Sequence, residues 1–115
     1  CVCHEAVNGV DALTMFNDAF LSEQPYNLVC LDIMMPRVDG IKVLKHIRAL
    51  EKKQKKNHRV LSKVIMITAL NDEKSVFECE QSGADAFLWK PIEIEQFHNI
   101  LKNMKLIVQQ NITLI

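Results

Sequence analysis

The sequence predicts an α/β protein with a doubly wound parallel sheet, and two observations support this fold class. Short apolar strands alternate with segments whose apolar residues recur at helical spacing. The strands expected at 26–31, 64–68 and 85–90 are apolar on both sides, which indicates that helices cover both faces of the sheet. The chain has 115 residues, of which 49% are hydrophobic, so one domain with a real core is expected.

Two strands and two helices are expected in the first half of the chain. A short strand at 2–6 ends in an Asn-Gly turn, and a helix follows over 10–21. Pro25 prevents that helix from continuing into the strand at 26–31. The second helix begins after Gly40, where apolar residues again recur at helical spacing.

The second half repeats this alternation. After the strand at 64–68, Asn71 is the expected cap of a third helix, which Gly83 terminates. The strand at 85–90 and the last helix, which begins after Pro91, complete the pattern. That helix has an apolar face made by Ile94, Phe97, Leu101 and Met104.

Charge and cysteine content exclude several classes of function. The 14 basic and 14 acidic residues balance, which argues against a binder of nucleic acid or membrane surfaces. No apolar run is long enough to span a membrane and no signal peptide is visible, so we expect a cytoplasmic protein.

Cys1 and Cys3 form a C-x-C pair without a second pair at zinc-like spacing. Reduced thiols are therefore favoured over a metal site.

One segment departs from the rest in composition. Residues 51–59 carry five Lys or Arg residues in nine positions. A solvated connection between a helix and a strand is the favoured interpretation, and a surface that docks a partner is the alternative.

Three apolar strands each end in a different polar side chain. Asp32, Thr68 and Lys90 follow directly on apolar runs. Because the carboxyl ends of parallel strands meet at one edge of a sheet, a carboxylate, a hydroxyl and an ammonium are expected to converge there. A carboxylate can act as a nucleophile, and the other two groups can hold the oxygens of a phosphoryl group that it attacks.

These motifs resemble the receiver domains of two-component response regulators, which have a flavodoxin-like fold. "LDIMMPRVDGIKVLKHIR" resembles the phosphoacceptor segment of that family, "VIMITALND" its Ser/Thr strand and "GADAFLWKP" its Lys-Pro strand. "EAVNGVDAL" resembles the turn after the family's second strand, and the likeness covers residues 2 to about 104. The resemblance implies a phosphoacceptor module that responds to a sensor histidine kinase or a phosphotransfer protein, and not a turnover enzyme.

The resemblance also implies a role for each residue of the site. Asp32 would accept the phosphoryl group with the help of Mg²⁺, Thr68 would hydrogen-bond it, and Lys90 would pair with its charge. The Met34 carbonyl would join Asp32 as a ligand of Mg²⁺, and Phe87 would be the aromatic residue that turns inward when Thr68 moves. The Lys90–Pro91 bond is often cis in this family, and a dimer that forms on phosphorylation fits the same family pattern.

Two apolar residues of the site are expected to prolong the phosphorylated state. Met34 and Leu70 lie two positions after Asp32 and Thr68, where the family's side chains flank the phosphoryl group. Neither side chain can orient an attacking water, so slow loss of phosphate is expected.

The family's first strand and first helix are not recognisable in this sequence. That strand carries two acidic residues that bind Mg²⁺, and it lies between the second and third strands in the order 2-1-3-4-5. The chain begins at Cys1 within an apolar stretch, so we interpret it as a receiver domain over 1–105 that lacks its N-terminal part. The cognate kinase, the output and the presence of further domains are left open.

The segment 106–115 is expected to be a tail or a continuation of the last helix. The helical spacing of Met104, Val108, Ile112 and Ile115 favours the helix. The alternative is a strand in the position of the family's first strand, with Gln109 and Gln110 where the acidic pair would be.

Two other functions remain as alternatives to a phosphoacceptor. A degenerate receiver would act only as a docking module, although the presence of Asp32, Thr68 and Lys90 argues against decay. A phosphatase of the haloacid-dehalogenase type also uses an aspartate at a strand end, but it needs a second aspartate two positions on. Met34 occupies that position, which disfavours the phosphatase.

Overall fold

The structure is a computed structural model that describes residues 2–22, 24, 26–33, 39–53, 62–69, 73–104 and 111–114. The strands are β1 (Val2–Glu5), β2 (Leu28–Asp32), β3 (Lys63–Thr68), β4 (Ala86–Trp89) and β5 (Asn111–Leu114). The helices are α1 (Gly9–Leu21), α2 (Gly40–Lys53), α3 (Glu73–Gln81) and α4 (Ile94–Asn103).

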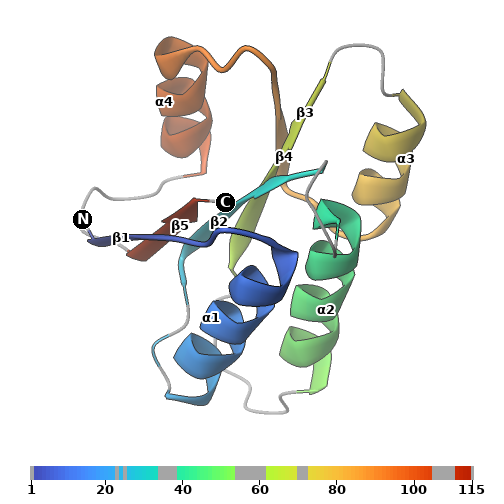
Figure 1. The fold of residues 1–115 in the computed structure, drawn as a ribbon. Helices are drawn as coiled ribbons and strands as arrows, with labels where there is room; N and C mark the ends of the chain where they lie inside the picture. Colours follow the sequence, from blue (N-terminus) through green and yellow to red (C-terminus); the bar gives the residue numbers. More distant parts are fainter. Residues whose placement is uncertain are drawn as a thin grey trace.

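All five strands pair in parallel in the order β1-β5-β2-β3-β4, and the sheet twists through the middle of the molecule (Figure 1). The predicted doubly wound α/β fold with a parallel sheet is therefore confirmed. The expected cap residue Asn71 lies outside the described residues.

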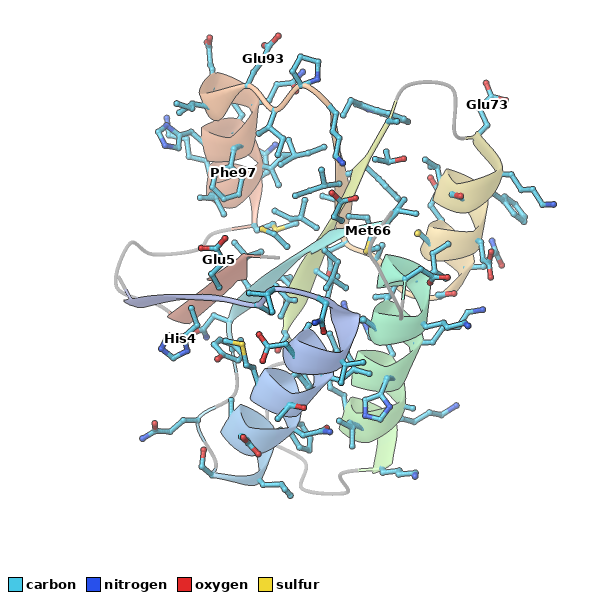
Figure 2. All side chains as sticks on the ribbon, viewed as in Figure 1. His4, Glu5, Met66, Glu73, Glu93 and Phe97 are labelled. Atoms are coloured by element: carbon cyan, nitrogen blue, oxygen red, sulfur yellow. The ribbon has the colours of Figure 1, made fainter. Side chains whose placement is uncertain are left out.

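Helices cover both faces of the sheet, as the apolar strands predicted. On one face, α1, α2 and α3 pack on Val29, Leu31, Val64 and Met66, and Figure 2 places Met66 in this interior. On the other face, α4 lies over Leu28, Cys30, Ile65, Ile67 and Leu88, with Phe97 among its contacting residues. The β2 positions from Leu28 to Leu31 are at most 1% exposed, so this strand has no wet face.

Local sequence signals explain where the first helix begins. The Asn8 side chain accepts a hydrogen bond from the Asp11 backbone N–H at 2.9 Å, and the Asp11 carboxylate accepts one from the Val7 N–H at 3.1 Å. This arrangement satisfies one backbone donor of the first helical turn and the N–H of the residue before the cap. The buried face of α1 is made by Gly9, Ala12, Phe16 and Phe20.

The C-terminal segment differs from the favoured expectation. Helix α4 ends at Asn103, and Asn111–Leu114 forms strand β5 between β1 and β2 (Figure 1, dark red between blue and cyan). A continuous helix over 106–115 is therefore wrong for residues 111–114, which belong to the same sheet as the rest of the domain. The alternative of a strand in the central position is right, but the strand begins after Gln109 and Gln110.

This strand order matches the expected order 2-1-3-4-5, with one substitution. The position between β1 and β2, which the resemblance assigns to the family's first strand, holds the last strand of this chain. The register pairs Val2 with Asn111 on one side and Leu28 with Ile112 on the other. Both inner edges of the gap therefore have a partner strand over these registers, which satisfies backbone groups that would otherwise be unpaired.

Candidate functional site

The phosphoacceptor candidate lies where the central part of the sheet reaches its carboxyl edge. Asp32 is the last residue of β2, and its side chain is 24% exposed, whereas the preceding four residues are buried. The Ile33 N–H donates to the Ile67 carbonyl at 3.0 Å, which extends the β2–β3 pairing just past Asp32. A rigid, buried strand thus presents one partly solvated carboxylate at the edge.

Lys90 reaches this carboxylate from the end of β4, which is separated from β2 by β3. Its Nζ lies 2.7 Å from the Asp32 Oδ2, and its side chain is 45% exposed. The Lys90 backbone N–H donates to the Thr68 carbonyl at 2.8 Å, which fixes the start of the turn after β4. The Lys90–Pro91 peptide bond is cis, as the resemblance implies.

Thr68 ends β3 between these two strands. It is 1% exposed, and its Oγ1 donates to the Ala69 carbonyl at a long distance of 3.4 Å. Register pairs Asp32 with Ile67 and Thr68 with Trp89, so Thr68 lies one residue further along the edge than the partner of Asp32. The three predicted residues therefore come from adjacent strand ends, with a direct side-chain contact between Asp32 and Lys90.

Phe87 lies in β4, two residues before the end of the strand. It pairs with Met66 in the β3–β4 register and is partly buried against the core that α1, α2 and α3 cover. Its side chain thus connects the interior of that face with the strand that carries Lys90. Met34 and Leu70, the two predicted modulating residues, lie outside the described residues.

The start of α2 approaches the backbone at the end of β2 closely. The Gly40 N–H donates to the Ile33 carbonyl at 3.1 Å, and a β-carbon at Gly40 would lie 2.9 Å from the Asp32 carbonyl carbon and 3.0 Å from the Ile33 Cα. Real Cβ atoms essentially never lie under 3.0 Å from such atoms. Only glycine fits here, because the start of α2 packs directly on the backbone of the phosphoacceptor.

Sequence inspection did not single out Asp39. Its Oδ1 accepts a hydrogen bond from the Lys42 N–H at 2.9 Å, so it caps the first turn of α2 beside the site. The available signal was an Asp immediately before a run of apolar residues at helical spacing.

The described residues supply only part of a magnesium site. Mg²⁺ in proteins is usually held by one or two carboxylates together with substrate oxygens and waters. Within the part of the chain that the structure describes, no group of three or more His, Cys, Asp or Glu residues could hold a metal ion. Asp32 is the only carboxylate at the three strand ends, and its Oδ2 already contacts the Lys90 ammonium. These residues alone therefore do not fit a complete Mg²⁺ site.

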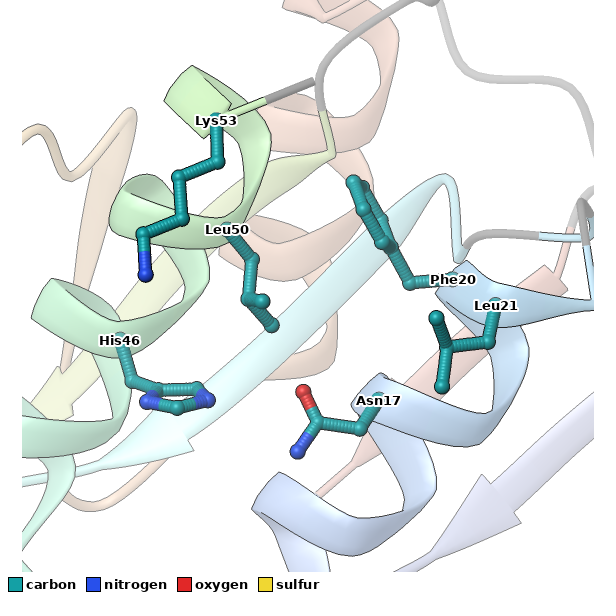
Figure 3. Close-up of a pocket in the computed structure, with 6 residues that line it drawn as sticks. All are labelled: Asn17, Phe20, Leu21, His46, Leu50 and Lys53. Atoms are coloured by element: carbon teal, nitrogen blue, oxygen red, sulfur yellow. The ribbon is translucent and has the colours of Figure 1, made fainter.

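A separate groove between α1 and α2 does not belong to this site. It has a volume of about 350 Å³ and is lined by Asn17, Phe20, Leu21, His46, Leu50 and Lys53 (Figure 3). Five of these residues come from the second halves of the two helices and His46 lies at the middle of α2, whereas Asp32 contacts the first residue of α2. The groove therefore lies toward the opposite edge of the sheet.

Comparison with known proteins identifies the family. The sequence profile of the response regulator receiver domain matches residues 1–102. The chain therefore belongs to the receiver-domain family, whose members are signalling modules of two-component systems and not turnover enzymes.

Individual relatives agree with this assignment. The chain is 35% identical over 104 residues to the probable C4-dicarboxylate response regulator DctR of Bacillus subtilis, covering 90% of this chain and 40% of DctR. It is 30% identical over 95 residues to the chemotaxis protein CheY of Bacillus subtilis, covering 83% of this chain and 68% of CheY. It is also 30% identical over 96 residues to the osmosensing histidine protein kinase SLN1 of Saccharomyces cerevisiae, covering 84% of this chain and 7% of SLN1. The chain thus spans well under half the length of two of these three relatives.

Solved structures show the same fold. The CheX-CheY-BeF3-Mg²⁺ complex from Borrelia burgdorferi matches with a TM-score of 0.69 and 28% identity, covering 87% of this chain and 66% of the matched chain. The receiver domain of the Francisella response regulator 1452 matches with a TM-score of 0.61 and 27% identity, covering 86% and 74%. No helix among the described residues is long and apolar enough to cross a membrane.

Proposed function

We propose that Asp32 accepts a phosphoryl group from a phosphohistidine on a sensor kinase or phosphotransfer protein, and that the phosphorylated chain changes its affinity for a partner. The observation that carries this proposal is the 2.7 Å contact between the Lys90 Nζ and the Asp32 Oδ2 at the carboxyl edge of the sheet. A carboxylate held beside one ammonium is suited to receive a group whose oxygens bear negative charge.

In the proposed transfer, an Asp32 carboxylate oxygen attacks the phosphorus of the donor. An O–P bond forms while the P–N bond to the histidine breaks, and the imidazole leaves with the bonding electron pair. Lys90 then exchanges its contact with the unmodified carboxylate for one with the phosphoryl oxygens, whose negative charge it pairs with. The reaction modifies this chain once, so it is a switching event and not turnover.

Thr68 and Phe87 are the proposed readout of that event. Among the described residues, the Thr68 hydroxyl makes one long bond of 3.4 Å to the Ala69 carbonyl, and it can exchange this bond for a phosphoryl oxygen at little cost. Movement of Thr68 would open space for Phe87, which is partly buried on the adjacent strand. Phosphorylation would then shift the population of Phe87 conformers and alter the surface of α3, β4 and α4.

The proposal includes Mg²⁺ as a cofactor that neutralises phosphoryl charge. Asp32 and the backbone of Met34 would be its ligands in this chain, and further carboxylates are needed to complete the site. A reducing, cytoplasmic location is part of the proposal, since Cys30 and Cys79 are buried thiols. The family match favours neither the docking-only alternative nor the phosphatase.

Mass measurement after incubation with a small phosphodonor tests the assignment. The chain is mixed with phosphoramidate and millimolar Mg²⁺, and phosphorylation is followed by intact mass and by acid and base lability. We expect one phosphoryl group on the native chain and on Asp39→Asn, a matched control that removes the carboxylate which caps the first turn of α2. Asp32→Asn should gain none. Equal labelling of Asp32→Asn, or labelling lost only in Asp39→Asn, would show that another residue is the acceptor.

The lifetime of the phosphorylated state is a second measurement of the same proposal. Met34 and Leu70 offer no polar group to orient an attacking water, so slow decay is expected. A Met34→Asn, Leu70→Glu double variant should lose its phosphoryl group faster than the native chain. Equal or slower decay in that variant contradicts the assigned role of these two residues.

A further inference from the structure

The most unusual feature of the sheet is that one of its inner strands is supplied by the last described segment of the chain. β5 (Asn111–Leu114) pairs with β1 on one side and with β2 on the other. β1 and β2 do not pair with each other. Among the described strands, β5 is therefore the one that joins β1 to the rest of the sheet. The space between β1 and β2, here named the strand slot, is thus a site for one extended segment that runs parallel to both neighbours.

The strand slot selects its occupant mainly through backbone hydrogen bonds. Four β5 residues pair with Val2–Glu5 and three pair with Leu28–Cys30 in the observed registers. These pairings require an extended segment of suitable length and direction, and they do not require that the segment be tethered to the same chain. A strand from another molecule would make the same contacts.

The order of events along the chain favours competition for the slot. Val2 and Asn111 are partners although the whole domain separates them in sequence, so the chain's own β5 segment reaches the slot only after β1, β2 and α4. Pairing at such long sequence separation closes slowly during folding. A second chain with an identical segment can fill the open slot in the meantime.

We propose that the strand slot also takes the 111–114 strand of a second copy of this chain, giving a reciprocal, strand-exchanged dimer. Each copy keeps every β5 pairing, and only the connection between α4 and β5 changes its path. This inference does not depend on phosphorylation of Asp32. In both forms β5 lies beside β2, and its register stops at the Leu114–Cys30 pair, two positions before Asp32.

Tethering sets the balance between the two forms. Residues 105–110 connect Met104, which caps α4, to β5, and a short tether gives an effective concentration on the order of 1 mM. If the exchanged dimer has the same contacts as the monomer, about 1% of chains would be dimeric at about 5 µM and about 40% at about 500 µM. Exchange should therefore be visible within an accessible range of protein concentration.

The native Cys30 provides a direct trap. It is the register partner of Leu114, and adjacent strands lie about 4.8 Å apart, which is within the Cα separation that a disulfide spans. In Leu114→Cys, the introduced thiol should therefore form a disulfide with Cys30, here named the trap disulfide. The monomeric form gives a link within one chain, and the exchanged form gives a covalent dimer held by two links.

The experiment refolds Leu114→Cys at about 5 to 500 µM, oxidises it, and separates the products on non-reducing gels, with peptide mapping of the linked cysteines. We expect the trap disulfide in both bands, with the share in the dimer band rising about 40-fold across this range. Leu114→Ser is the matched control for background oxidation of the other thiols. A trap disulfide confined to the monomer band at every concentration, or absent from both bands, would overturn the proposal.

A measurement on the unsubstituted chain tests the proposal even if Leu114→Cys fails to fold. Native mass spectrometry is applied after isotope-labelled and unlabelled chains are refolded together at about 500 µM. We expect mixed dimers, and we expect their lifetime after dilution to exceed that of a dimer held by a simple surface contact. The reason is that their separation requires withdrawal of β5 from both slots. Monomers alone would contradict strand exchange in the native sequence.

Discussion

The first residue of α2 lies directly against the backbone of the candidate phosphoacceptor: a β-carbon on Gly40 would overlap the Asp32 carbonyl oxygen. The Gly40 N–H also donates to the Ile33 carbonyl at 3.1 Å. The helix start and the end of β2 are therefore one rigid unit, and the position of the Asp32 carboxylate depends on the absence of a side chain at Gly40.

Gly40→Ala is expected to displace Asp32 and to slow its phosphorylation. The atoms in the way belong to the backbone and cannot move aside as a flexible side chain would, so a loss of stability of about 1–3 kcal/mol is expected. A shift of about 1 Å in a reacting group can slow a reaction about 100-fold. Chemical denaturation and the rate of labelling by a small phosphodonor measure the two effects.

Gly83→Ala is the control for instability alone. Gly83 has a φ of 100° at the end of α3, so alanine there is strained, and the change should destabilise by about 1–3 kcal/mol. Its nearest atoms are those of the Arg48 side chain, away from Asp32. If Gly83→Ala slowed labelling of the folded chain as much as Gly40→Ala, the slowing would reflect instability and not the position of Asp32.

Removal of the Lys90 charge is expected to slow phosphorylation with little loss of stability. Lys90→Met keeps most of the side-chain volume and removes the ammonium 2.7 Å from the Asp32 Oδ2. Because the lysine side chain is 45% exposed, solvent screens part of its effect, and a decrease of about 10- to 100-fold in the labelling rate is expected. Lys102→Met, in the last turn of α4, is the matched change of an exposed lysine. Equal rates in the two variants would remove Lys90 from the proposed chemistry.

The site could be predicted from sequence because each of its residues directly follows a strongly apolar strand. Local pattern identified the ends of β2, β3 and β4, and parallel geometry then placed Asp32, Thr68 and Lys90 along one edge. None of these steps needed information about distant pairing.

β5 was predicted only as the less favoured alternative because its assignment depends on pairing partners and not on its own residues. Apolar residues at 104, 108, 112 and 115 satisfy a helical period, while four residues at 111–114 are too few to reveal a strand period. What favours the strand is the pair of unpaired edges that β1 and β2 would otherwise leave. Gln109 and Gln110 precede this strand, so they do not occupy the carboxyl end that the acidic pair would need.

A second feature that sequence could not reveal is the network around Arg48. Its guanidinium donates to the Ser62 carbonyl at 2.8 Å, the Gly83 carbonyl at 3.0 Å, and the carboxylates of Glu51 at 2.6 Å and Asp85 at 2.7 Å. One side chain of α2 thus ties together the start of β3 and the segment before β4. The partners are up to 37 positions apart, beyond the reach of local pattern.

Arg48→Ala is expected to lower the free energy of unfolding by about 2–3 kcal/mol, because it leaves the nearly buried Glu51 carboxylate without its charge partner. Arg48→Lys should recover only part of this loss, since an ammonium cannot reproduce the planar set of donors. Urea denaturation of both variants measures the effect. A loss in Arg48→Ala no larger than that in the control below would show that the network contributes little.

The control is the exposed pair between Lys45 and Glu78, with a 2.9 Å contact. The hydrogen bond to Glu78, followed by the charge of that carboxylate, raises the pKa of Lys45 above its usual value of 10.5. A raised pKa in the folded state means that the contribution is fully present below about pH 10.5 and is lost only as the pH rises through the higher value. Lys45→Ala should therefore change stability slightly and equally between pH 6 and 8.

The last prediction concerns Mg²⁺ and follows from the occupant of the strand slot. Asp32 is the only carboxylate among the three strand ends, and the β5 register stops two positions before it, so this chain should bind Mg²⁺ weakly. Fusing a strand and helix of the receiver-domain family that carry the acidic pair upstream of Cys1 should supply these carboxylates, provided that the added strand displaces β5. Trp89 adjoins Lys90 and is 36% exposed, so its fluorescence can report the titration.

We expect Mg²⁺ affinity to rise about tenfold or more in the fusion, and a fusion with asparagines in place of the acidic pair should not show this increase in affinity. Equal affinity in the chain and both fusions would mean that the carboxylates beside Asp32 are unnecessary, and that β5 does not limit the metal site.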